Sequence, residues 1–595
     1  MKNLLTAFIL FWVMTLSGQS SLHFTVTMDQ PSTHLYQVRM DIRGFDGPLD
    51  LKMPAWTPGY YWLLDLAKNV SGFTALSADG RRLDWDKTAK NTWHIETGGA
   101  PEVVVTYNVY AFTQSVAHPF LDDGRGFISP TGIFLHPEGH KDHPVTVTIK
   151  PYKEWPEIST GLDPVPGRPG TFEAADYDIL YDCPTLVGNQ QILSFEVNGI
   201  PHTVALENPV DDSFRDKYVS DLKKIVETGS AVIGDIPYKH YTFIIMGRGG
   251  GGLEHSNSMA VYSGRNYSLN DSPGYKRWLA FLSHEYFHLY NIKSIRPINL
   301  GPFDYDRENL THMLWVSEGF TVYFEYFIVN QGGLMNREET LEAFTHNITN
   351  YEYLPGSRVQ SATGSSYDTW LQFFNRSDNA DNTAISYYDK GCILGLLMDL
   401  KIRHETKGKK SLTDVMRTLY RTYFQELKRG FTDDEFREVC EKTAGVSLEE
   451  IFRYASTTEP IDYGKYLAYA GMAIDTKPAV LPGAFWGATV QERNNNLTVT
   501  AIEQDSPAWQ SGLSTQDQLL EINGQPATRE LLDKTLSAAS AGDPLTVKIS
   551  RRTGEKTITC SLTKKSRPSF RISPMPEATA EQLAIRDQWL APDRK

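Results

Sequence analysis

The pentapeptide His284-Glu285-Tyr286-Phe287-His288 is the feature that most constrains how this chain can fold. It lies in an apolar stretch that begins at Ser272-Pro273, a typical helix start, and that we expect to end at Pro297. Four residues make slightly more than one helical turn, so both imidazoles project from the same face. The spacing therefore predicts a helix that offers two histidines to one tetrahedral zinc ion.

Two glutamates extend this pair into a candidate catalytic site. Glu285 can take a proton from a zinc-activated water, as a general base does. Glu318 lies 30 residues after His288, in a second helical segment that can return antiparallel and supply a third ligand. Two histidines and one glutamate leave the fourth zinc position open, as catalysis requires. We predict one zinc ion per chain, held by His284, His288 and Glu318.

Glu325 lies seven residues beyond Glu318, about two helical turns on, and so shares its face of the helix. It either accepts a hydrogen bond from a ligand imidazole or is a solvated helix glutamate. The pentapeptide itself arises by chance in roughly a few per cent of chains this long. The alternative to a metal site is therefore a pair of ordinary structural histidines.

A glycine-rich segment, Gly249–Gly252, follows the apolar run Tyr241–Met246 and precedes Glu254. Glycine lets a substrate backbone approach closely, so Gly251 and Gly252 are candidate substrate contacts. Glu254 supplies an anion that can capture a free α-amino group, which is what an aminopeptidase requires. A flexible loop with an incidental glutamate is the alternative. A phosphate loop is disfavoured because the Lys-Ser/Thr ending is missing.

The N-terminus indicates an exported protein, periplasmic or secreted. A positively charged start precedes an apolar run from Leu4 to Leu16, and small residues follow, as in a secretory signal peptide. The run is shorter than the about 20 residues of a membrane span, so we expect no membrane contact after cleavage. An uncleaved anchor is the alternative. The formal net charge of -14 argues against nucleic acid as the main partner.

The pattern along the chain predicts a multidomain α+β protein. Short strand-like segments with turn residues between them favour a β-sandwich near the N-terminus, and helical periodicity dominates from about 273 to 455. We expect a loosely ordered tail, because its composition is rich in proline and charge. The expected divisions are a signal peptide at 1–20, an N-terminal β domain at 21–205, a zinc catalytic domain at 206–345, a helical domain at 346–475, a small β-rich module at 483–566 and a tail at 567–595.

Six segments follow one another along the chain in a specific order: Pro54–Tyr60, Gly251-Gly252-Leu253-Glu254-His255, the pentapeptide at 284–288, Leu289–Pro297, Trp315–Tyr323 and Tyr388-Asp389-Lys390-Gly391. Their order and spacing resemble the glycyl aminopeptidase family of gluzincin zinc metallopeptidases. That family combines an N-terminal β domain, a thermolysin-like catalytic domain, a helical domain and a C-terminal PDZ domain, and the resemblance implies the same order here.

The resemblance also implies roles for single residues. It gives the metal positions and Glu285 the functions already predicted from spacing. Glu254 matches the glutamate that binds the substrate amine, although Leu253 and His255 stand where the wider aminopeptidase group has methionine and asparagine. Tyr388 matches the tyrosine that stabilises the tetrahedral oxyanion as a phenol donor. Its neighbour Tyr387 is the competing candidate, and a tyrosine that only packs in the core is the alternative.

Residues 483–566 resemble a PDZ domain. Phe485-Trp486-Gly487-Ala488 matches the carboxylate-binding loop, and Asp517–Gly524 is the most specific segment. Such modules bind extended C-terminal peptides by adding a strand to a sheet edge. A protein or peptide C-terminus is therefore an expected partner besides the peptide substrate, with a purely structural module as the alternative.

These observations predict an exported zinc aminopeptidase, and the resemblance implies a preference for small N-terminal residues, glycine or alanine. A zinc endopeptidase that recruits protein C-termini through its PDZ domain is the first alternative. The second is a non-catalytic peptide-binding protein with a structural metal site, because a motif match remains a hypothesis.

Overall fold

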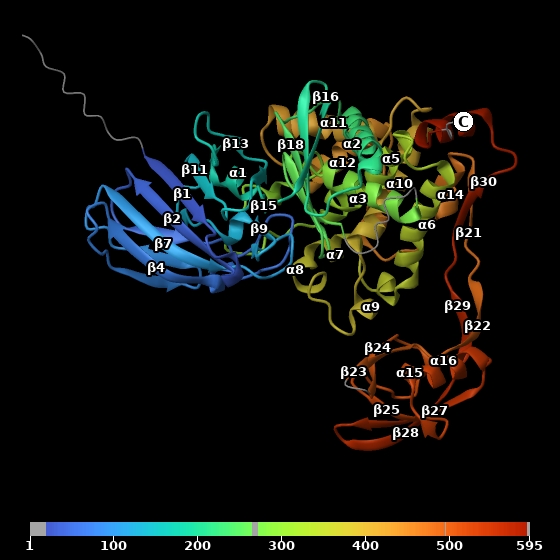
Figure 1. Ribbon diagram of the computed structural model, residues 1–595. Coiled ribbons are helices and arrows are strands. Elements are labelled where there is room, and N and C mark those ends of the chain that lie inside the picture. Colours follow the sequence, from blue (N-terminus) through green and yellow to red (C-terminus); the bar gives the residue numbers. More distant parts are fainter. Residues whose placement is uncertain (1–19, 264–271, 494–495, 592–595) are drawn as a thin grey trace, which may run out of the picture.

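The computed structural model describes residues 20–263, 272–493 and 496–591 (Figure 1). The signal peptide expected at 1–20 lies, except for its last position, outside the described residues. Figure 1 shows a β-rich domain at the N-terminal end, a mixed centre, a helical region beside it and a small β-rich module set apart from the rest. The multidomain α+β fold expected from the sequence is confirmed. Within the described residues, no helix is both long and apolar enough to cross a membrane.

The N-terminal domain is a β-sandwich of a seven-stranded and a four-stranded sheet around one hydrophobic core. In β2, every second side chain is buried, which is the alternation of a strand with one face on a core. The larger sheet consists of β1 (Ser21–Thr27), β2 (Leu35–Arg43), β4 (Val70–Ser77), β7 (Glu102–Tyr110), β11 (Val145–Lys150), β13 (Asp163–Pro164) and β14 (Thr171–Ala174). The smaller sheet consists of β3 (Leu49–Lys52), β5 (Trp85–Ala89), β6 (Thr92–Ile95) and β10 (His136–Pro137).

A third sheet joins this sandwich to the centre of the molecule. Its aromatic and aliphatic side chains share a core cluster with the central sheet, including Phe127 and Leu186 on one side and Ile244 on the other. The short helix α1 (Tyr177–Tyr181) lies next to it in sequence, and Asp182 is its C-cap residue. The strands of the third sheet are β8 (Phe120–Leu121), β9 (Arg125–Ile128), β12 (Glu157–Thr160) and β15 (Thr185–Gly188).

The central sheet begins earlier in the chain than the sequence suggests. Its order is β16 (Gln191–Val197), β17 (Ile200–Leu206), β18 (Tyr241–Met246), β20 (Ser258–Tyr262) and β19 (Gly252–Glu254). β16 and β17 form a hairpin through Asn198-Gly199, which both have positive φ, and β17 then pairs in parallel with β18. The boundary expected between 205 and 206 is therefore wrong, because these strands pair with the central sheet and not with the sandwich.

Helices pack against this sheet and against each other around the largest core cluster. The expected boundary between 345 and 346 is also wrong, because it falls inside one continuous helix, α6. The helices that carry the candidate site or pack against its helices are α2 (Asp212–Ile233), α3 (Pro273–Phe287), α4 (Leu314–Ser317), α5 (Gly319–Gln331), α6 (Arg337–Tyr353) and α10 (Tyr387–Glu405). The others of the helical region are α7 (Ala362–Tyr367), α8 (Thr369–Gln372), α9 (Ala380–Thr383), α11 (Leu412–Leu419), the π-helix Tyr420–Glu426, α12 (Asp433–Ala444), α13 (Glu449–Ser456) and α14 (Tyr463–Ala468).

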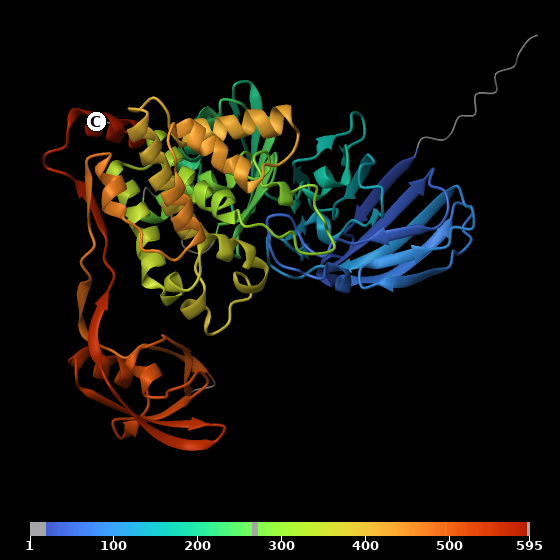
Figure 2. The same ribbon diagram turned by 180° about the vertical axis from the view of Figure 1, so that it is seen from behind.

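The PDZ-like module is connected to the helical region by two antiparallel strand pairs, as both views show (Figures 1 and 2). β21 (Met472–Asp475) leads toward the module and pairs with the returning β30 (Arg571–Pro574). Nearer the module, β22 (Ala479–Phe485) pairs with β29 (Thr563–Arg567). The module itself contains β23 (Ala488–Arg493), β24 (Asn496–Ile502), α15 (Pro507–Gln510), β25 (Gln518–Ile522), β26 (Gln525–Pro526), α16 (Arg529–Ala538), β27 (Pro544–Arg551) and β28 (Gly554–Ser561).

The tail expected to be loosely ordered is instead part of the helical region. After β30 the chain forms α17 (Ala580–Trp589), which begins with a capping box. Trp589 is fully buried and its ring stacks on Phe344 at 5.8 Å between centroids. The Arg337 guanidinium also donates to the Leu590 carbonyl oxygen at 2.8 Å. Buried aromatic surface thus orders a segment whose composition resembles that of a linker.

Candidate functional site

Three buried side chains of the central region converge on one point. The Nε2 atoms of His284 and His288 are 3.0 Å apart, and Glu318 Oε2 lies 3.7 Å and 3.1 Å from them respectively. All three ligand atoms lie within 4.8 Å of one another. Donors on a tetrahedral zinc with bonds near 2.0–2.1 Å are separated by roughly 3.3 Å. Two imidazole nitrogens and one carboxylate oxygen therefore fit a catalytic zinc ion in both chemistry and spacing.

The helix that carries the two histidines is shorter than the sequence suggests. α3 ends at Phe287, so the end expected at Pro297 is wrong. His288 is the C-cap residue and keeps a right-handed helical backbone, with φ -61° and ψ -24°. Both imidazoles therefore still project from one face. The start is as expected, because the Ser272 side chain accepts a hydrogen bond from the Tyr275 backbone N–H and Pro273 occupies the first turn.

Asn291, three residues after His288, links the two segments that carry the metal-capable side chains. Its side-chain amide donates to the carbonyl oxygens of Val316 and Ser317, at 2.9 Å and 3.0 Å, just before Glu318. Its own backbone carbonyl accepts a hydrogen bond from His288 Nδ1 at 2.9 Å. With the proton on Nδ1, the Nε2 lone pair of His288 faces the cluster. One asparagine thus ties both ligand-bearing segments together.

Glu318 lies where α4 ends and α5 begins, and Glu325 follows two turns along α5. Glu325 Oε2 lies 2.8 Å from His284 Nδ1, so the carboxylate accepts a hydrogen bond from the ring nitrogen of His284 that faces away from the cluster. Its side chain is only 13% exposed, which rules out the solvated helix glutamate considered above. Each histidine of the cluster therefore has a hydrogen-bond acceptor on its outer nitrogen.

Glu285 is buried beside the cluster, next to Gly252. Burial raises the pKa of Glu285 to about 7, against the lowering influence of His284 and His288. Gly252 has the glutamate carboxylate directly against it, since a Cβ built there would lie 2.1 Å from Glu285 Oε1. Gly252 was predicted to let a substrate backbone approach, and the structure places it on the cleft wall against Glu285.

Tyr388 and Tyr387 occupy different places at the start of α10. Tyr388 lines the cleft beside the cluster, with its ring centroid 6.2 Å from that of His284. Burial raises the pKa of Tyr388 well above its ordinary value, so its phenol stays protonated and able to donate. Tyr387 is fully buried, and its hydroxyl is engaged with Thr369 Oγ1 at 2.9 Å. Of the two tyrosines, Tyr388 is the one placed to reach a ligand in the cleft.

The cleft around the cluster has a volume of about 530 Å³ and is partly built by the N-terminal domain. Gly251, Gly252 and Glu254, the predicted substrate contacts, lie on its wall together with Gly59, Tyr60 and the segment 114–116. Gly59 has φ +91°, and a Cβ there would lie 2.6 Å from Glu254 Oε1. The segment Pro54–Tyr60 therefore contacts the site directly, whereas the sequence offered it only as a family signature.

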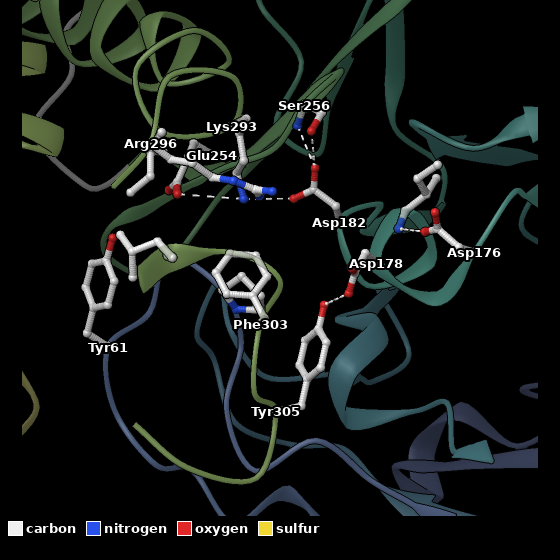
Figure 3. Close-up of a pocket in the computed structure, with 15 residues that line it drawn as sticks. Tyr61, Asp176, Asp178, Asp182, Glu254, Ser256, Lys293, Arg296, Phe303 and Tyr305 are labelled. Atoms are coloured by element: carbon white, nitrogen blue, oxygen red, sulfur yellow. Dashed lines mark hydrogen bonds and ion pairs between the residues drawn. The ribbon is translucent and has the colours of Figure 1, made fainter. Parts of the chain in front are cut away.

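Glu254 ends β19 and is buried, 4% exposed. Its Oε1 has no hydrogen-bond partner among the described residues. The nearest cation is Lys293, whose Nζ lies 3.8 Å away and is itself bonded to Asp182 (Figure 3). The sequence did not indicate Asn291 or Lys293 individually, although both lie in the quoted segment Leu289–Pro297.

Comparison with known proteins agrees with this geometry. Family models match the peptidase M61 N-terminal domain at residues 23–189, the M61 glycyl aminopeptidase at 277–394 and a PDZ domain at 484–562. The middle match contains all three side chains of the metal-capable cluster. The chain is a zinc metallopeptidase, and its catalytic segment matches the glycyl aminopeptidase family. The resemblance stated from the sequence is thus confirmed.

Two solved structures resemble this chain to different extents. An aminopeptidase N family protein from Idiomarina loihiensis matches with a TM-score of 0.87 and 28% identity, over 96% of this chain and 100% of that chain. An M1 zinc metallopeptidase from Deinococcus radiodurans matches with a TM-score of 0.48 and 11% identity, over 74% of this chain and 94% of that chain. A search of curated proteins gave no match.

The contact between Gly252 and Glu285 gives a first prediction for the peptidase. Gly252→Ala should lower kcat/KM for alanine p-nitroanilide by about a hundredfold, because the new methyl group displaces the Glu285 carboxylate. Initial rates of the zinc-loaded variant measure this. Gly250→Ala is the matched control in the same loop, since a Cβ at that position meets nothing within 4 Å. Equal losses in both variants would mean that loop flexibility, and not the contact with Glu285, is what matters.

Proposed function

We propose that the peptidase is an exported zinc aminopeptidase that removes small N-terminal residues, glycine or alanine, from peptides. The observation that carries this proposal is the buried Glu254 Oε1, which lacks a hydrogen-bond partner among the described residues and lies in the same cleft as the metal-capable cluster. An unpaired buried acceptor is costly. A substrate with a free α-ammonium group would supply the missing donor.

The finer parts of the proposal have separate support. Export rests on the signal-like sequence of residues 1–20. The preference for small residues rests on the match to a glycyl aminopeptidase model. It is also supported by two aromatic rings on the wall of the same cleft as Glu254, where Tyr60 stacks on Phe374 at 4.8 Å between centroids.

His284, His288 and Glu318 would hold the zinc ion, one per chain. When bound, zinc supplies the Lewis acidity that polarises a peptide carbonyl and acidifies a water molecule. Glu325 and the Asn291 carbonyl keep the two outer imidazole protons in place, so that both Nε2 atoms stay available. The protein thus fixes the donor set before any ligand arrives.

The remaining groups act on the substrate. Glu254 binds the α-ammonium group and thereby sets which peptide bond is presented for cleavage. Glu285 accepts the proton of the attacking water on a carboxylate oxygen and delivers it to the leaving amine. The Tyr388 hydroxyl donates a hydrogen bond to the carbonyl oxygen as that oxygen gains negative charge.

The PDZ domain would bind a protein or peptide C-terminus. Its loop Phe485–Ala488 borders a cavity of about 320 Å³ whose other side is formed by the helical region, including Tyr353 and Asn382. Asn382 also bonds the module's backbone, donating to the Ile502 carbonyl at 2.8 Å. This contact supports a module that is held in place while its loop faces a cavity.

Blocking the substrate amine tests the proposed function. The zinc-loaded enzyme should cleave Ala-Ala-Phe with a free N-terminus at least about a hundredfold faster than its N-acetylated form, because the acetyl group removes the charge that Glu254 would bind. Product analysis by liquid chromatography measures both rates, and elemental analysis should give one zinc per chain. Glu254→Ala should abolish most of the discrimination. Equal cleavage of both peptides would contradict the proposal and favour an endopeptidase.

A further inference from the structure

A second, smaller cavity lies behind Glu254, where the N-terminal β domain meets the catalytic region (Figure 3). Its volume is about 140 Å³. Both cations on its wall, Lys293 and Arg296, come from the segment Leu289–Pro297, of which the proposed mechanism uses only Asn291. The charged residues that line it are Asp176, Asp178, Asp182, Glu254, Lys293 and Arg296.

The Lys293 ammonium group lies between two carboxylates but bonds only one of them. Its Nζ donates to Asp182 Oδ1 at 2.8 Å, which is a charge-assisted hydrogen bond. The distance from Nζ to Glu254 Oε1 is 3.8 Å, beyond hydrogen-bond reach. The Lys293 side chain is 9% exposed, so water screens neither interaction strongly. Lys293 thus offsets the charge of Glu254 through space and leaves its oxygen open.

Hydrogen bonds from His255 and Ser256 fix the Asp182 carboxylate beside Lys293. Its Oδ1 also accepts from His255 Nδ1 at 3.1 Å, and its Oδ2 accepts from the backbone N–H and the hydroxyl of Ser256, at 2.8 Å and 2.6 Å. Burial by itself would raise the pKa of Asp182, but Lys293 and His255 hold it well below its usual range. Asp182 therefore presents a fixed anion from the end of α1 in the N-terminal domain.

The backbone before Lys293 is equally fixed. Ile292 has φ 138°, a conformation that β-branched residues rarely adopt. The preceding Asn291 is clamped by its side-chain hydrogen bonds to the segment that carries Glu318. With this backbone fixed, a movement of the lysine side chain alone decides whether its ammonium group bonds Asp182 or Glu254.

We infer that Asp182 is a positioning residue that draws the Lys293 ammonium away from Glu254, so that Glu254 Oε1 stays free for the substrate's α-ammonium group. Without the Asp182 charge, the lysine would close the 3.8 Å gap and occupy the same oxygen. The N-terminal β domain would thereby control amine recognition in the catalytic region. This inference rests on the proposed role of Glu254.

A pair of inhibitors isolates the amine contribution. Alanine hydroxamate and propionohydroxamate carry the same zinc-binding group and differ only in the α-amino group. The ratio of their inhibition constants therefore measures amine recognition apart from metal binding. Asp182→Asn should lower the preference for alanine hydroxamate by about tenfold or more. In this variant the Lys293 ammonium group would bond Glu254 and compete with the inhibitor's amino group. Inhibition by propionohydroxamate should change by less than about threefold, which also shows that the site is folded.

Asp178→Asn is the matched control. It removes one negative charge from the same cavity by the same chemical change, but Asp178 bonds the Tyr305 hydroxyl at 2.6 Å and not Lys293. Its inhibitor ratio should match that of the unmodified enzyme. The double variant Asp182→Asn/Lys293→Met should regain most of the preference, because the competing ammonium group is gone.

The outcomes separate this inference from the proposed function. If the unmodified enzyme binds both hydroxamates equally, the proposed amine anchor fails. If it prefers alanine hydroxamate and Asp182→Asn keeps that preference in full, Asp182 is not the positioning residue. Loss of preference in Asp178→Asn to the same extent would also overturn the inference, because any loss of charge from the cavity would then suffice.

Discussion

Glu285→Gln should lower the turnover of alanine p-nitroanilide by about a thousandfold while leaving one zinc bound per chain. Glutamine has the shape of glutamate but cannot accept the proton of the attacking water, and general-base catalysis contributes typically 10²–10⁴-fold. The change keeps the close packing against Gly252, so the cleft should retain its form. Steady-state rates and elemental analysis of the same protein sample provide the two measurements.

The control for this variant is Glu338→Gln, which makes the same chemical change at an exposed glutamate in the first turn of α6. Its turnover should stay within about twofold of the unmodified enzyme, as for most surface substitutions. Turnover by Glu285→Gln above about a tenth of the normal value would mean that another group takes the proton. The mechanism proposed for the cleft would then be wrong.

Gly391→Ala is expected to destabilise the catalytic region by roughly 3 kcal/mol, the upper end of the usual overpacking cost. A Cβ at this position would lie 2.2 Å from the Trp315 carbonyl oxygen and 2.8 Å from Gly319 Cα. Both contacts are to backbone atoms of the α4–α5 segment, which cannot rotate away as a side chain can. Because Glu318 lies between these two positions, we also expect the variant to retain less zinc.

Thermal unfolding followed by circular dichroism, with zinc content measured on the folded fraction, tests this prediction. Gly464→Ala in α14 is the matched control, because the nearest atom to its Cβ lies at 3.6 Å, an ordinary contact distance. That change should be neutral or slightly stabilising. An unfolding midpoint of Gly391→Ala equal to that of the control would show that α5 and α10 can separate without cost.

Local periodicity was enough to predict the histidine pair of the metal-capable cluster. The four-residue spacing of His284 and His288 survives the early end of α3, because His288 keeps a helical backbone. The helical spacing from Glu318 also places Glu325 at His284 Nδ1. Both depend on geometry within one helix or its first residues, which sequence spacing encodes directly.

The contacts that N-terminal residues make with the catalytic region could not be predicted in the same way. Gly59 and Asp182 reach the catalytic region only because whole sheets pack together, and no local pattern encodes that packing. The same cause explains the boundary error at 205–206, since strand partners are set by tertiary contacts. It also explains the tail, where burial of Trp589 outweighs a linker-like composition.

The two strand pairs that carry the PDZ domain have a mechanical consequence. Asp475 and Arg571 lie directly opposite each other in the ladder, so the chain leaves the helical region and re-enters it at one place. A module on a single flexible linker could occupy many positions, whereas the paired strands restrict the positions of the PDZ domain. A peptide caught at the PDZ loop would stay at a steady distance from the zinc cleft. Effective local concentration, and not affinity alone, would then decide which captured chains are trimmed.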